Sequence, residues 1–155
     1  MEEVARIDRN GGRSPSPSPD LRTTLLAAGH RCTPQREAVH EVLCKLRNHP
    51  TAEEIFLAVR RRVPAISLAT VYNALESFES AGVCLKLTQG DGAARYDSRT
   101  DDHHHLQCVE CERIFDVSGP PLAEWLAAID TRGEFELLGG RLVLEGRCPG
   151  CRRNG

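Results

Sequence analysis

The chain has 155 residues, 40% of them apolar, and a formal net charge of −2, which allows one ordinary domain or two small ones with packed cores. No apolar run reaches the roughly 18 residues of a membrane span and the N-terminus lacks a secretion signal, so we expect a cytoplasmic protein with no membrane partner. Residues 21–100 carry more Lys and Arg than Asp and Glu and are the better candidate for nucleic-acid contact, although this charge also fits a solvated surface.

The first 20 residues end in an alternating Ser-Pro run over residues 14–19. Proline cannot continue a helix, and such a segment offers little apolar surface to bury. We therefore predict a disordered tail over residues 1–20, and an inert extension is its simplest interpretation.

Four short helices are predicted after this tail, each bounded by a capping residue, a glycine or a proline. Thr33 before Pro34 is typical of a helix start, and the sequence from Thr51 to Glu54 is a capping box. The predicted helices start at Leu21, Pro34, Thr51 and Ser67, and they end near Gly29, residue 47, Pro64 and residues 80–82.

The apolar period changes after the fourth helix. Val83, Leu85 and Leu87 alternate with other side chains, which favours a strand. Residues Ala94–Asp97 can form its partner strand after a turn at Gln89–Gly92. Short helices followed by a hairpin are the order of a winged helix-turn-helix, which binds DNA.

The residues after 101 predict a second, smaller unit of mixed helix and strand, so the expected fold class is α+β. Its helix has one apolar side, and Gly139-Gly140 is a hairpin signal between two of its strands. The strands are predicted at His105–Cys108, Arg113–Val117, Phe135–Leu138 and Arg141–Leu144, and the helix at Pro120–Asp130.

Seven cysteines are an odd number, so a complete disulfide framework is not expected. Four of them form two Cys-x-x-Cys pairs, Cys108/Cys111 and Cys148/Cys151, a pattern that favours a closed structural Zn²⁺ site. The alternative is that one pair is redox-active. Such motifs begin a helix after a strand, whereas Cys148 and Cys151 lie near the end of this sequence.

A run of histidines beside acidic residues precedes the first cysteine pair. On a strand, His103 and His105 point to the same face. Two imidazoles with carboxylates nearby suit Fe²⁺, Mn²⁺ or Zn²⁺. The alternatives are a solvent-exposed histidine run and a metalloenzyme that activates water at this site.

The predicted fourth helix carries polar side chains at its N-terminal end, the end with which a recognition helix reaches base edges. Ser67 and Thr70 can contact phosphates or bases. Tyr72 can pack against thymine methyl groups, and Asn73 can hydrogen-bond a base. The period alone would fit an ordinary surface helix equally well.

Taken together, these motifs resemble the ferric uptake regulator (Fur) family over residues 21–151. The resemblance implies a homodimeric repressor, not an enzyme, that binds double-stranded DNA with an A/T-rich inverted repeat. It also implies a winged-helix DNA-binding domain over 21–98 and a zinc-stapled dimerisation domain over 99–155, and it leaves the predicted disordered tail over residues 1–20 outside the match. The segments that carry it are Thr33-Pro-Gln-Arg36, His49-Pro-Thr-Ala52, Ala69-Thr-Val-Tyr72, His103-His-His-Leu-Gln-Cys-Val-Glu-Cys111 and Cys148-Pro-Gly-Cys151.

Two metal sites follow from this resemblance. Without it, three of the regulatory ligands would be taken for capping or turn residues. The structural Zn²⁺ is expected at Cys108, Cys111, Cys148 and Cys151. The regulatory Fe²⁺ or Mn²⁺ is expected at His49, Asp97, His103, His105 and Asp116.

The regulatory ligands are similar to those of the peroxide-sensing branch, the PerR repressors. Iron-sensing members usually have glutamate in place of Asp97 and Asp116, and arginine in place of Asn73. The resemblance therefore implies that peroxide oxidises a ligand histidine, either His49 or His103. The alternatives are an Fe²⁺ or Mn²⁺ uptake regulator that does not sense peroxide, and a zinc-stapled interaction module that ignores DNA.

Overall fold

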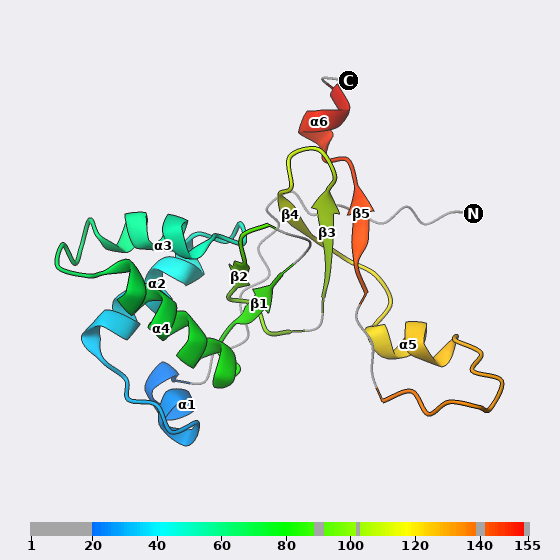
Figure 1. Cartoon of the computed structure of the whole chain (residues 1–155), viewed down its shortest axis with the longest axis horizontal. Coiled ribbons are helices and arrows are strands. Elements are labelled where there is room, and N and C mark those ends of the chain that lie inside the picture. Colours follow the sequence, from blue (N-terminus) through cyan, green and yellow to red (C-terminus); the bar gives the residue numbers. More distant parts are fainter. Residues whose placement is uncertain (1–19, 89–91, 102, 139–141, 154–155) are drawn as a thin grey trace. The chain divides into compact units, whose positions relative to one another are not determined.

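The computed structural model of the chain describes residues 20–88, 92–101, 103–138 and 142–153 (Figure 1). These residues fall into two compact units, which divide between Thr100 and Asp101. Within the described ranges, no helix is both long and apolar enough to cross a lipid bilayer. Three predicted features lie wholly or largely outside the described residues: the tail over residues 1–20 and the turns at Gln89–Gly92 and Gly139-Gly140. The predicted end of the dimerisation domain at residue 155 also lies outside them.

Four helices make up most of the first unit, and each is capped by the side chain that precedes it. Asp20, Thr33, Thr51 and Ser67 each accept a hydrogen bond from the backbone N–H three residues on. The side chain of Glu54 accepts a hydrogen bond from the backbone N–H of Thr51, which completes the predicted capping box. The helices are α1 (Leu21–Ala27), α2 (Pro34–Lys45), α3 (Ala52–Val59) and α4 (Leu68–Ser80).

The third helix ends earlier than predicted, at Val59 instead of Pro64. The chain turns directly after it, and the amide of Arg62 donates to the carbonyl of Val59 across this turn. Ile66 can then reach the apolar core, where it is buried. Burial of a side chain beyond the helix, and not the proline, therefore sets this boundary.

One apolar core holds the four helices together and fixes the orientation of α4. Val71, Leu75 and Phe78 of α4 are fully buried, and each contributes roughly 1.5–3 kcal/mol of burial free energy. Because these residues recur at helical spacing, Tyr72 and Asn73 lie on the exposed face. Fully buried partners from the other helices are Leu25, Val39, Leu43, Ile55 and Val59.

A two-stranded antiparallel hairpin follows α4, made of β1 (Leu85–Leu87) and β2 (Arg95–Asp97). The predicted first strand is confirmed, but its apolar alternation does not mark a buried face, since Leu85 and Lys86 are both exposed. Cys84 is buried at 1% exposure, whereas Leu85 is 37% exposed. Only three residues of β1 are paired, so its apolar alternation is too short to decide which face meets the core.

The second unit contains a three-stranded sheet in the order β4-β3-β5. The pair β3 and β4 is antiparallel, and β5 lies parallel to β3 on its other side. The fold is therefore α+β, as predicted. The elements of this unit are β3 (His104–Cys108), β4 (Ile114–Val117), α5 (Leu122–Ala127), β5 (Leu144–Gly146) and α6 (Pro149–Arg153).

The predicted hairpin in this unit is wrong. Phe135–Leu138 forms no strand, and β5 pairs in parallel with β3 instead of antiparallel with that segment. The helix predicted over Pro120–Asp130 is also shorter, and none of its residues is buried. Most apolar side chains of these segments are exposed, so burial contributes little to regular structure there.

Candidate metal centres and nucleic-acid interface

The four predicted zinc ligands lie together at one end of the sheet in the second unit. Cys108 ends β3, and Cys111 follows it in the turn to β4. After β5, Cys148 directly precedes α6 and Cys151 lies within it. Because β5 lies beside β3, the two pairs meet, and the four sulfur atoms lie within 4.8 Å of one another. The sulfur atoms of Cys111 and Cys148 are 3.8 Å apart.

These distances fit zinc and do not fit a disulfide. A disulfide places two sulfur atoms about 2.05 Å apart. Zinc–sulfur bonds of about 2.3 Å in a tetrahedron place any two sulfur atoms about 3.8 Å apart, which matches the separation of Cys111 and Cys148. A closed four-cysteine site of this kind leaves no coordination position for a substrate.

Hydrogen bonds favour the thiolate forms of two of these cysteines. Backbone N–H groups, first that of Cys148 at 3.3 Å, lower the pKa of Cys108 to about 6. The guanidinium of Arg113 donates to Cys111 at 3.4 Å and lowers its pKa. The pKa of Cys151 is raised, mainly by its hydrogen bond to Cys148 and by burial. Because a zinc ligand is a thiolate, binding of the ion would displace the proton that Cys151 retains.

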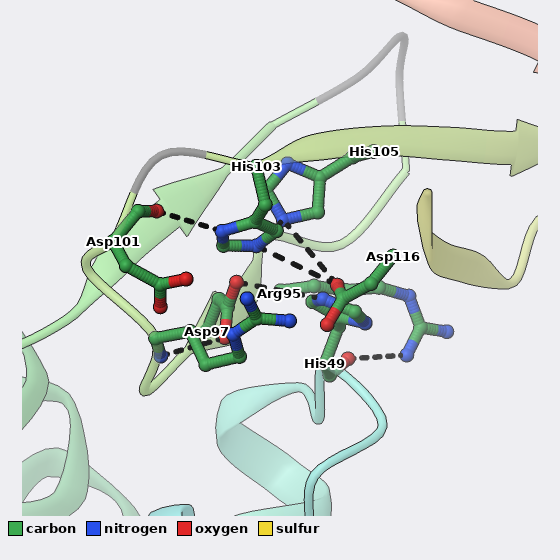
Figure 2. A network of polar contacts seen from close by, with 8 residues as sticks. His49, Arg95, Asp97, Asp101, His103, His105 and Asp116 are labelled. Carbon is green, nitrogen blue, oxygen red and sulfur yellow. Dashed lines mark hydrogen bonds and ion pairs between the residues drawn. The ribbon is translucent and has the colours of Figure 1, made fainter. Parts of the chain in front are cut away.

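Three of the predicted regulatory ligands converge at the other end of β3 (Figure 2). The rings of His103 and His105 lie on the same side of the chain, and their Nε2 atoms are 2.9 Å apart. Asp116 lies opposite His105 on β4, and its Oδ1 atom is 3.5 Å from Nε2 of His103 and 3.8 Å from that of His105. Two neighbouring ligands on an ion with bonds of about 2.1 Å lie about 3.0–3.4 Å apart, so this arrangement fits one metal ion.

A backbone carbonyl fixes the orientation of one of these histidines. Nδ1 of His103 lies 2.8 Å from the carbonyl oxygen of Asp101, to which only a protonated nitrogen can donate (Figure 2). In neutral His103 the lone pair is then on Nε2, the atom that faces His105 and Asp116. A carbonyl partner of this kind commonly orients a metal-ligating histidine.

His104 has a different environment from its two neighbours. It is buried on the opposite face of β3, and its Nε2 lies 2.5 Å from the carbonyl oxygen of Pro120, which also accepts from the indole of Trp125 at 3.2 Å. The ring contacts Gly119, where an added Cβ would lie 3.0 Å from it. His104 therefore supports the start of α5, and its Nε2 is directed away from His103 and His105.

The remaining two predicted ligands lie together in the first unit. Nε2 of His49 is 3.6 Å from Oδ2 of Asp97, and both side chains are buried (Figure 2). Asp97 ends β2, and its Oδ1 accepts the amide of Arg99 at 2.8 Å, which fixes the carboxylate. A buried carboxylate beside an imidazole is a nitrogen and oxygen pair that suits Fe²⁺ or Mn²⁺.

Three contacts hold β2 against the segment that carries His49. The side chain of Arg95 donates to the carbonyl oxygen of His49 at 2.9 Å, the amide of Tyr96 donates to that of Pro50, and Thr51 bridges to Arg95. These contacts place Asp97 beside His49, although 47 intervening positions separate them in the sequence. Sequence reasoning missed the role of Arg95, because an arginine in a strand carries no signal that its partner is a distant carbonyl.

The predicted DNA-contacting residues lie at the N-terminal end of α4. Ser67 is the N-cap, and its hydroxyl lies 2.8 Å from that of Thr70. Tyr72 and Asn73 are exposed one turn further along. The hydroxyl of Tyr72 donates to a carboxylate oxygen of Glu53 at 2.7 Å, a contact that the sequence did not indicate.

Known proteins resemble this chain in both sequence and structure. A match to the ferric uptake regulator family covers residues 27–145. The peroxide-responsive repressor PerR of Staphylococcus epidermidis is 37% identical over 132 residues, which cover 85% of this chain and 88% of that protein. The solved ferric uptake regulator of Vibrio cholerae has a TM-score of 0.67 and 28% identity, over 83% of this chain and 100% of that one. The solved Campylobacter jejuni peroxide stress regulator has a TM-score of 0.63 and 25% identity, over 84% of this chain and 96% of that one.

Proposed function

The chain belongs to the ferric uptake regulator family, and from this we propose that it is a metal-dependent transcriptional repressor that senses hydrogen peroxide. The observation that carries the proposal is the grouping of ligands within each unit. His49 lies beside Asp97 in the first unit, and His103 and His105 lie beside Asp116 in the second. Proteins of this family are transcriptional regulators, and the sequence relative reported above is a peroxide-responsive repressor.

Two metals with different roles are proposed. Zn²⁺ binds Cys108, Cys111, Cys148 and Cys151 and stabilises the second unit. Fe²⁺ or Mn²⁺ binds a single regulatory site, a ligand set that the resemblance to the family implies. Its ligands are His49 and Asp97 from the first unit and His103, His105 and Asp116 from the second. A metal that binds residues of both units favours one conformation of the dimer over others, and this difference in affinity is what makes DNA binding depend on the metal.

Peroxide sensing is proposed to act through the loss of a ligand. Bound Fe²⁺ would promote cleavage of the O–O bond of hydrogen peroxide, so that one oxygen atom is added to a ligand histidine, His49 or His103, and the other leaves as water. An oxidised imidazole is a poorer ligand, so the affinity for the metal falls and the repressor releases DNA. Aspartate at positions 97 and 116 and asparagine at position 73 support this branch over an iron-uptake regulator.

Double-stranded DNA and a second copy of the chain are the proposed partners. Ser67, Thr70, Tyr72 and Asn73 contact an A/T-rich inverted repeat through the major groove. An inverted repeat requires two copies of the recognition helix, and the second unit supplies the surface that joins them. Its exposed apolar side chains include Trp125, Ile129, Phe135 and Leu138.

A mobility-shift assay on an A/T-rich inverted repeat tests the proposal. The protein is loaded with Fe²⁺ or Mn²⁺, with and without a pulse of hydrogen peroxide. Both metals are expected to promote binding, and only the ferrous protein is expected to release DNA after peroxide. Mass spectrometry should then find an added oxygen atom on His49 or His103. If neither form responds to peroxide, the protein is an Fe²⁺ or Mn²⁺ uptake regulator with the same ligands.

A further inference from the structure

The exposed tyrosine of the proposed recognition helix is held by a residue of the preceding helix. Tyr72 is only 37% exposed, and its hydroxyl donates to Oε1 of Glu53 at 2.7 Å. Glu53 lies in the first turn of α3, one residue after the start of that helix. The bond therefore joins α3 to α4, the two helices of the proposed helix-turn-helix, through exposed side chains.

The carboxylate of Glu53 is itself held in place. Its strongest interaction is the hydrogen bond from Tyr72, and its own backbone N–H and the side chain of Thr51 add to it, so that its pKa is lowered. A negative charge in the first turn of a helix also interacts favourably with the free N–H groups there. Glu53 is thus an ionised acceptor for the hydroxyl of Tyr72.

A carboxylate at this position is unfavourable for DNA binding in general. DNA phosphates repel it, so its presence weakens binding to every sequence alike. A side chain that costs affinity and yet hydrogen-bonds the recognition helix fits a role in discrimination between sequences. By holding the hydroxyl, Glu53 restricts the rotation of the Tyr72 ring and keeps the hydroxyl from bonding phosphate, which leaves the ring as the contacting group.

We propose that Glu53 is a positioning residue for DNA specificity, which fixes the ring of Tyr72 in the orientation that contacts a thymine methyl group. The inference rests on the proposed DNA-binding function. In this arrangement, the selectivity of Tyr72 for thymine depends on a hydrogen-bond acceptor in another helix, Glu53 of α3. The same hydrogen bond raises the pKa of Tyr72, so its hydroxyl stays protonated and remains a donor.

Two substitutions separate the position of the ring from the charge. Glu53→Gln and Glu53→Ala both remove the repulsion of phosphates, but only Glu53→Ala removes the acceptor. Tyr72→Phe removes the donor and retains the ring. Each protein, loaded with Mn²⁺, is titrated with a duplex that carries an A/T-rich inverted repeat, with the same duplex in which one thymine per half-site is replaced by uracil, and with a scrambled duplex.

The wild-type protein and Glu53→Gln should bind the thymine duplex more tightly than the uracil duplex, by about fourfold for each methyl group that becomes buried. Glu53→Ala and Tyr72→Phe should each lose most of this preference for the thymine duplex. A variant with both substitutions should lose no more of the preference than either single variant does. Both Glu53 variants should bind the scrambled duplex more tightly than the wild type does. Circular dichroism confirms that each variant is folded.

Three outcomes distinguish the possibilities. If Glu53→Ala keeps the wild-type ratio of thymine to uracil binding at each thymine position tested in turn, the positioning role is wrong. If Glu53→Gln loses the ratio as fully as Glu53→Ala, the negative charge and not the acceptor is responsible, which also overturns it. If wild-type protein binds the inverted repeat no better than the scrambled duplex, the proposed function fails and this inference fails with it.

Discussion

His49 has a backbone conformation that is unusual for its residue type. Its φ angle is 51°, in the left-handed region, and Pro50 follows it. Side chains with a Cβ rarely adopt this region, and strain of this kind costs of order 1–3 kcal/mol. The hydrogen bond from Arg95 to the carbonyl of His49 helps to maintain the conformation. We interpret the strain as the cost of directing a buried imidazole toward Asp97.

Substitution of His49 by glycine or alanine separates strain from metal binding. Both variants lack the imidazole, so both should lose DNA binding that depends on Fe²⁺ or Mn²⁺ while retaining zinc. Glycine adopts the left-handed region without a Cβ penalty, so His49→Gly should unfold with a free energy about 1 kcal/mol higher than His49→Ala. Urea denaturation measures this difference. An alanine variant as stable as the glycine variant would show that the backbone is unstrained at this position.

The position of α4 depends on one arginine at the start of α2. Arg36 donates to the carbonyl oxygen of Arg31 at 2.6 Å and to the hydroxyl of Ser77 at 2.8 Å, and Ser77 in turn donates to the carbonyl oxygen of Asn73. Ser77 is buried in α4. The guanidinium therefore joins the loop before α2 to the middle of the proposed recognition helix. These contacts explain the arginine in the motif Thr33-Pro-Gln-Arg36.

Removal of this guanidinium should destabilise the first unit. Hydrogen bonds from a charged donor contribute about 1.5–3 kcal/mol, so Arg36→Ala should lower the free energy of unfolding by an amount in that range. Arg22 provides the control, because its ion pair with Glu37 is exposed and Arg22→Ala should change stability by less than about 1 kcal/mol. Urea melts of both variants measure the difference. Equal effects of the two substitutions would contradict this role for Arg36.

The sequence predicted elements better where the signal is local. The caps at Thr33, Thr51 and Ser67 are local, and all three begin helices as expected. The strand after α4 formed as predicted, but the hairpin near residue 139 did not, because strand pairing depends on which surface is available for burial. A short apolar alternation predicts that one face of a strand is buried, but it does not predict which other element packs against that face.

The candidate sites show the same limit. The two cysteine pairs and the alternation of His103 and His105 follow from spacing alone. The pairing of His49 with Asp97 does not, since contacts between β2 and a distant loop bring them together. Only the resemblance to a family indicated that pair in advance. The contact between Glu53 and Tyr72 had no sequence signal, because an exposed glutamate in a first helical turn is ordinary.

Zinc should contribute much of the stability of the second unit. In the described part of this unit the buried side chains are His104, Cys108, Ile114 and Cys148, and two of these four are proposed zinc ligands. Removal of zinc leaves the cysteines crowded without a cation and separates β3 from α6. We therefore expect a strong chelator to unfold residues 101–155 while the helices of the first unit remain folded.

Amide hydrogen exchange, read by mass spectrometry on the full chain, measures this. Peptides that cover β3 and β4 should lose protection in step with zinc release, and peptides that cover α2 and α4 should not. Addition of Zn²⁺ under reducing conditions should restore the protection. If β3 keeps its protection after zinc is lost, the sheet is stable without the metal and the site has another role.

The exposed apolar side chains of the second unit predict how two copies associate. Phe135 is 72% exposed and Leu138 is 89% exposed, in a segment without regular structure. An isolated chain gains nothing from apolar side chains in water, whereas a second copy could bury them and add order to the segment. Leu138→Asp should therefore favour the monomer, because a carboxylate cannot be buried in an apolar interface without a partner.

Leu26 provides a matched control for this substitution, since it is also exposed, at 58%, but lies in α1 of the first unit. Sedimentation velocity should find Leu26→Asp as dimeric as the wild type and Leu138→Asp shifted to the monomer, with both variants folded and both retaining zinc. The monomeric variant should also bind a duplex with one half-site as well as it binds an inverted repeat, because the advantage of two linked recognition helices is lost. If Leu138→Asp remains dimeric at the same protein concentrations, the surface around Leu138 is not the one that joins the two copies.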